Sequence, residues 1–78
     1  MLRLELVDNM QGEIIYNYFP EEKEEYGTIS MNKETGQLEI KKISENDSHR
    51  RYLFHAMKRI EEYFTEKRFL EKDVVAWY

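Results

Sequence analysis

The sequence predicts an α+β fold: a four-stranded antiparallel β-meander, one amphipathic helix packed on one face, and a short C-terminal strand or turn. In the first half of the chain, apolar and polar residues alternate over short segments, which is the period of a half-buried strand. Between about residues 48 and 67 the apolar residues recur every three to four positions, the period of a helix. With 78 residues, the chain is expected to form a single domain, 1–78.

Residue type and alternation predict the first two strands. Segment 2–7 alternates leucine with other residues, and segment 8–12 is composed of turn-forming residues. Segment 13–19 is rich in isoleucine, tyrosine and phenylalanine, which favour strands. Pro20 ends this strand because proline cannot donate to a central ladder. The acid-rich segment 21–25 is expected to be a solvated loop.

Segments 26–31 and 38–43 are the third and fourth predicted strands, joined through a turn at residues 32–36. Asparagine suits the start of this turn, and glycine suits a left-handed position near its end. With Asn32 opposite Gln37, the apolar residues of both strands fall on one face. The expected pairs are Met31 with Leu38 and Ile29 with Ile40.

The helix is predicted to begin at Asp47 or Ser48, both good N-cap residues, and to end near residue 67. Its apolar stripe comprises Leu53, Met57, Ile60 and Phe64, flanked by Ala56 and Tyr63. Its polar face comprises Arg51, His55, Lys58, Glu62 and Glu66.

Residues 73–78 return to the sheet, where adjacent valines favour a short strand and a single helical turn is the alternative. The predicted core combines the inward-facing strand residues with the helix stripe. It comprises Leu4, Leu6, Ile15, Ile29, Leu38, Ile40, Leu53, Met57, Ile60 and Phe64.

Segment 13–19 carries large apolar groups on both faces, whereas one helix covers only one face of a sheet. If Ile15 and Phe19 face the helix, the tyrosines of this segment face away; the opposite register leaves Ile15 and Phe19 outside. The residues alone do not choose between these registers. The C-terminal segment can instead fold over the open face.

An open sheet face rich in tyrosine is typical of a protein interface. The candidate interface residues are Tyr16, Tyr18, Tyr26 and Trp77. The leading hypothesis is therefore a small non-enzymatic module for protein interaction, with a second copy of itself (a homodimer) or another protein as its partner.

Nucleic-acid binding is the alternative, because charge is unevenly distributed along the chain. The net charge is −4, yet segment 49–60 holds four Lys/Arg residues and no acid. Its candidate contacts are Arg51, His55, Lys58 and Arg59. An ordinary solvated helix face accounts for the same residues, and no known nucleic-acid-binding motif accompanies them.

An enzyme is the least favoured interpretation. The chain has no cysteine, no glycine-rich phosphate loop and no spacing typical of a catalytic triad. Its histidines, His49 and His55, are six residues apart and so do not share a helix face. We therefore predict no catalytic residue, no cofactor and no metal site.

The absence of cysteine fits a reducing cytoplasm, and no apolar run approaches the roughly 20 residues of a membrane span. A short meander with the turn 32–36, a helix and the ending Ala76-Trp77-Tyr78 resembles a family of short bacterial proteins, a domain of unknown function. This resemblance implies a small cytoplasmic accessory protein and transfers no site residue.

Overall fold

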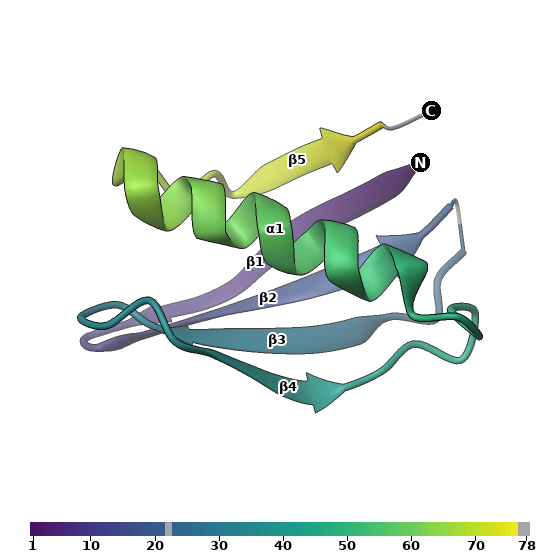
Figure 1. Cartoon of the computed structure of the whole chain (residues 1–78), viewed down its shortest axis with the longest axis horizontal. Coiled ribbons are helices and arrows are strands. Elements are labelled where there is room, and N and C mark those ends of the chain that lie inside the picture. Colours follow the sequence, from purple (N-terminus) through teal and green to yellow (C-terminus); the bar gives the residue numbers. More distant parts are fainter. Residues whose placement is uncertain (22, 77–78) are drawn as a thin grey trace.

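The computed structural model describes residues 1–21 and 23–76, which form a five-stranded antiparallel sheet with one helix packed on it (Figure 1). The elements are β1 (Leu2–Met10), β2 (Glu13–Pro20), β3 (Gly27–Asn32), β4 (Leu38–Lys42), α1 (Arg51–Glu66) and β5 (Lys72–Val75). The strand order is β4-β3-β2-β1-β5, so β4 and β5 form the two edges. The predicted α+β class, with a meander and a C-terminal strand, is confirmed.

The first hairpin is longer than predicted. β1 continues to Met10, so the turn contains only Gln11 and Gly12, and Gly12 has a φ of +89°. Asp8 and Asn9, expected in the turn, pair with β2 instead. A register shift between Leu6 and Asp8 allows this, because a bulge absorbs one residue and lets the pairing continue beyond it.

The second hairpin has the predicted register. The backbone N–H of Asn32 donates to the carbonyl oxygen of Gln37 over 2.9 Å, and Ile29 lies opposite Ile40. The side-chain oxygen of Asn32 accepts the backbone N–H groups of Glu34 and Thr35. This Asx-type turn explains why asparagine begins it.

The helix begins at Arg51, three to four residues later than predicted. Arg50 is the N-cap residue and has a left-handed backbone with φ of 57°. Asp47 acts as a cap from outside the helix: its carboxylate accepts the N–H of Tyr52 over 3.1 Å and that of Leu53 over 2.8 Å. The prediction found the capping residue and misplaced the first turn.

The buried stripe of α1 is rotated relative to the prediction. Leu53, Ala56, Ile60 and Tyr63 are its buried residues. Met57 and Phe64, placed at the centre of the predicted stripe, are only half-buried and pack on the edge of the core. The helix lies over β1, β2 and β5 (Figure 1).

The tyrosines of β2 face the helix, which settles the register that the sequence left open. Tyr16 and Tyr18 are almost completely buried, whereas Ile15 and Phe19 lie on the opposite face. Each buried hydroxyl has a partner: Tyr16 donates to the carbonyl of Leu70 over 2.6 Å, and Tyr18 accepts the backbone N–H of residue 44 over 3.0 Å. These bonds remove the cost of burying the hydroxyls.

The predicted core is largely confirmed. Leu4, Ile29, Leu53 and Ile60 are buried, and Leu6, Leu38, Met57 and Phe64 pack against them. Two members are wrong. Ile15 lies on the face away from the helix, and Ile40, on an edge strand that the helix does not reach, is 44% exposed.

The C-terminal segment extends the sheet. β5 pairs antiparallel with β1, Leu2 lying opposite Val75, so residues 72–75 form the predicted strand. They add an edge to the sheet and leave its open face uncovered (Figure 1).

Candidate interaction surfaces

The open face of the sheet carries two neighbouring aromatic rings, each with a cation packed against it. The Arg3 guanidinium lies 4.3 Å from the centre of the Phe19 ring, and the ammonium group of Lys42 lies 4.3 Å from that of Tyr26. The two rings are 5.6 Å apart and tilted. Each ring therefore already has a cation and a second ring as neighbours, and Tyr26 keeps 38% of its surface exposed.

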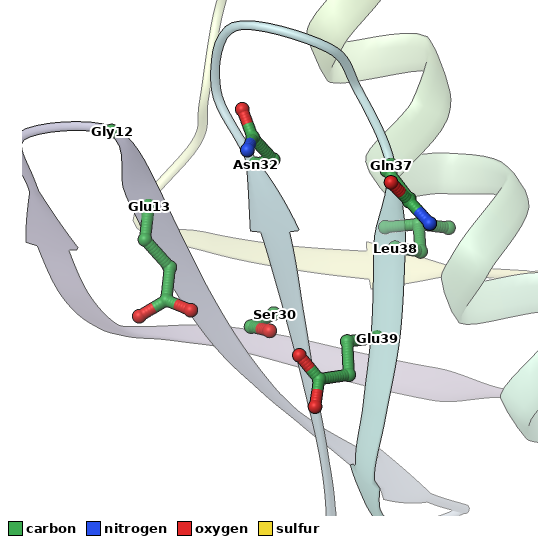
Figure 2. Close-up of a pocket in the computed structure, with 7 residues that line it drawn as sticks. All are labelled: Gly12, Glu13, Ser30, Asn32, Gln37, Leu38 and Glu39. Atoms are coloured by element: carbon green, nitrogen blue, oxygen red, sulfur yellow. The ribbon is translucent and has the colours of Figure 1, made fainter.

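A shallow polar hollow of about 360 Å³ lies on this open face near the hairpin turns (Figure 2). Figure 2 shows the carboxylates of Glu13 and Glu39 on either side of Ser30. Asn32, also in the lining, is already committed to the β3–β4 turn. The lining contains no histidine or cysteine, and its acidic groups alone assign no ligand.

Three of the four candidate nucleic-acid contacts lie on the solvent side of α1. Arg51 and Lys58 are exposed, and His55 is half-buried. Arg59 turns instead toward β5 and forms ion pairs with Asp73 over 3.1 Å and with Glu62 over 3.4 Å. The basic patch is thus smaller than the sequence indicates.

A polar cluster joins α1 to β5. Asp73 accepts the hydroxyl of Tyr63 over 2.5 Å as well as the guanidinium of Arg59, and the Tyr63 ring lies 5.5 Å from that of Tyr16. Burial raises the pKa of both tyrosines, and the charge of Asp73 raises it further. Hydroxyls with raised pKa values hold their protons at neutral pH, so Tyr63 keeps donating to Asp73 and this cluster fastens β5 to the helix.

Exposed apolar side chains lie on and after edge strand β4. We define the β4 surface as Leu38, Ile40, Ile43, Phe54 and Met57. Ile43 is 37% exposed and Phe54 is 61% exposed, so large apolar groups here face solvent. Among the described residues nothing lies beyond β4 (Figure 1).

Met57, on the helix, lies on the flank that faces the β3–β4 hairpin. Phe64 marks this flank, because a Cβ on Gly36 of that hairpin would lie 2.8 Å from its ring. Met57 is seven residues before Phe64 and therefore lies on the same side of the helix. Phe54, three residues before Met57, lies farther round toward solvent and is 61% exposed.

Within residues 1–21 and 23–76, no strand pairs with the outer side of β4. Since Asn32 donates to Gln37, the alternation of an antiparallel ladder directs Glu39 toward β3, and Leu38 and Ile40 away from the sheet. Their N–H and C=O groups thus form an open edge, the arrangement that accepts an additional strand.

The opposite edge is different. The N–H of Leu6 donates to the carbonyl of Glu71 over 2.8 Å, and by alternation Val74 of β5 directs its backbone outward. That N–H donates to the Asp73 carboxylate over 2.8 Å. One outward donor of this four-residue edge strand is therefore occupied.

Two of the four candidate interface residues are unavailable in this fold. Tyr16 and Tyr18 lie beneath the helix, so the expectation that they form an interface is wrong. Tyr26 lies on the open face and is 38% exposed. Trp77 lies outside the described residues.

Sequence reasoning missed the β4 surface although a signal for it was available. A helix is about 10 Å wide and strands are about 4.8 Å apart, so one helix covers roughly two strands. An outer strand of a wider sheet must then keep part of its apolar side uncovered.

Within residues 1–21 and 23–76, no three His, Cys, Asp or Glu side chains gather as ligands for a metal ion. In the same part of the chain, no helix has the length and apolar character that crossing a bilayer requires. The resemblance to short bacterial proteins of unknown function stays a prediction. No protein-family model, curated protein or solved structure matches this chain.

Proposed function

We propose that this chain is a small, non-enzymatic cytoplasmic protein that acts as an interaction module and self-associates through the β4 surface. A single observation carries the proposal: an open strand edge carries the exposed apolar side chain of Ile40 and is followed by exposed Ile43. The burial of Tyr16 and Tyr18 moves the proposed interface from the open sheet face to this edge.

Strand addition uses both parts of the β4 surface. An added strand pairs with the outward backbone groups of Leu38 and Ile40, and these main-chain hydrogen bonds supply much of the affinity. The apolar side chains beside the edge lose water on contact, which contributes about 25 cal/mol per Å² of buried apolar surface. Since β4 has only five residues, the interface is small and the association weak.

Sedimentation equilibrium on the wild-type protein and two edge variants tests this proposal. Ile40→Lys places a charge in the β4 surface and is expected to abolish self-association. Val74→Lys is the matched control, because it changes an exposed β-branched residue to lysine on the other edge strand. This control should associate like the wild type.

Two outcomes would contradict the proposal. The first is a wild-type protein that stays monomeric at several hundred micromolar, and the second is equal weakening by both variants. Circular dichroism on each variant checks that the fold is retained, so that loss of association is not loss of structure.

Nucleic-acid binding through α1 is the second candidate, because Arg51 and Lys58 are exposed on one helix face. The ion pairs of Arg59 and the acids Glu62 and Glu66 nearby weaken it. Binding of a monomer to single-stranded DNA, with affinity that falls steeply as salt rises, would favour this candidate over self-association.

A further inference from the structure

We infer that the partner of the β4 surface is a second copy of this chain, paired antiparallel along β4 with a two-fold axis at Ile40. The inference rests on the proposed function and assigns its partner and register. Ile40 then faces Ile40 of the second copy, and Glu39 faces Lys41. Regular pairing does not extend to Lys42, because the pairing of β4 with β3 shifts register between Ile40 and Lys42.

The backbone of Ile40 suits a position on the axis. Its N–H and C=O both point away from the sheet, so the two copies of Ile40 can exchange two hydrogen bonds as a closely spaced antiparallel pair. The axis stands perpendicular to the sheet, which keeps both helices on the same side of the joined sheet.

The charges of β4 are complementary to themselves in this register. Glu39 of one copy lies opposite Lys41 of the other, and the same pair recurs across the axis. Within one chain the Lys41 ammonium already lies 3.2 Å from the Glu39 carboxylate, which places both on one face of the strand. Pairing two copies joins these exposed ion pairs into a network of four alternating charges. Such a network contributes more to stability than isolated surface ion pairs do.

Neighbouring registers are unfavourable for the same reason. The outward backbone groups of the two strands stay opposite one another only if one strand is displaced along the other by two residues. One such shift places Glu39 opposite Glu39 of the second copy, and the other places Lys41 opposite Lys41. Like charges directly opposite each other on a sheet are destabilising, so the charge pattern selects Ile40 as the centre.

The other side of the joined sheet carries the apolar part of the interface. Ile40 faces the helix side of the sheet, together with Ile29. Its side chain is nearly half exposed in a single chain and meets its own copy across the axis.

Charge-swap variants test the register. Glu39→Lys alone places lysine opposite lysine, and Lys41→Glu alone places glutamate opposite glutamate, so each is expected to lose at least tenfold in self-association. An equimolar mixture of the two should form a heterodimer, because every cross-pair then joins opposite charges. The chain with both substitutions should associate like the wild type.

Glu34→Lys is the control for net charge, since Glu34 is exposed in a turn away from β4. It changes the net charge as Glu39→Lys does and should leave association unchanged. Sedimentation equilibrium at low salt measures all five proteins and the mixture.

The outcomes separate the register from the proposed function. A wild-type protein that dimerises while neither single variant weakens it, or while the mixture forms no heterodimer, overturns the register and leaves self-association standing. A wild-type protein that stays monomeric overturns both. Recovery in the mixture and in the double variant supports the two-fold pairing of β4.

Discussion

Asp47 fixes the start of the helix from a position outside it. Both carboxylate oxygens are used, one for the N–H of Tyr52 and the other for the N–H of Leu53, and the side chain is buried. These bonds satisfy donors that a helix N-terminus otherwise leaves unpaired. The cap also compensates for the left-handed backbone of Arg50, which an ordinary side chain rarely adopts.

Replacement of this residue tests the cap. Asp47→Ala is expected to lower the free energy of unfolding by about 1–2 kcal/mol, because two backbone donors lose their partner. Ser48→Ala, at the neighbouring exposed residue, is the control and should change it by less than about 0.5 kcal/mol. Urea unfolding followed by circular dichroism measures both, and equal effects would refute the capping role.

At the scale of elements, Gly36 joins the β3–β4 hairpin to the helix. Its φ of +79° suits glycine, and a Cβ there would lie 2.8 Å from the ring of Phe64. Gly12 in the first hairpin has a similar φ of +89° and open space around the same position. A side chain at Gly12 would therefore cause backbone strain alone, whereas a side chain at Gly36 would cause backbone strain and a steric clash with Phe64.

Alanine substitution at each glycine makes use of this difference. Gly12→Ala should cost about 1 kcal/mol of stability from the left-handed backbone alone. Gly36→Ala should cost roughly 1–3 kcal/mol more, because Phe64 must move from its place against the core. Thermal unfolding compares the variants, and an equal loss at both positions would show that the contact with Phe64 is unimportant.

Local signals determine the parts of the fold that could be predicted. The turn chemistry at Asn32 and the alternation around it specify the hairpin register, and the helical period specifies one helix. The buried face of β2 could not be predicted, because Ile15 and Tyr16 are both large. That choice depends on hydroxyl partners such as the carbonyl of Leu70, 54 positions along the chain.

The candidate site escaped prediction for a related reason. Alternation correctly places Ile40 on the helix side, but its exposure depends on where the helix crosses the sheet. That position follows from packing over β1, β2 and β5, and the last of these strands pairs at the opposite edge from β4. A fifth strand at that edge draws the helix away from β4.

For the molecule as a whole, the buried tyrosines predict lower stability at alkaline pH. Burial is the main cause that raises the pKa of Tyr16, Tyr18 and Tyr63 above the ordinary value of 10.0. The unfolded chain loses these protons from about pH 10 upward, while the folded chain retains them. Deprotonation thus favours the unfolded state, so stability is fully present below about pH 10 and falls above it.

Urea midpoints measured between pH 8 and pH 11 test this pH dependence. The midpoint should stay level up to about pH 9.5 and then decline. The urea midpoint of Tyr63→Phe should decline less steeply with pH. That of Tyr26→Phe, at a more exposed ring, should decline as in the wild type. A midpoint that does not change up to pH 11 would contradict the prediction.

The occupied amide of Val74 determines how far association can proceed. Growth into a fibre requires two strand edges on every molecule that can each pair with a neighbouring molecule. Among residues 1–21 and 23–76, the Asp73 carboxylate takes the Val74 donor and β5 is short, so β4 offers the more open of the two edges. A molecule that associates through β4 alone forms a closed pair, and its assembly stops at two.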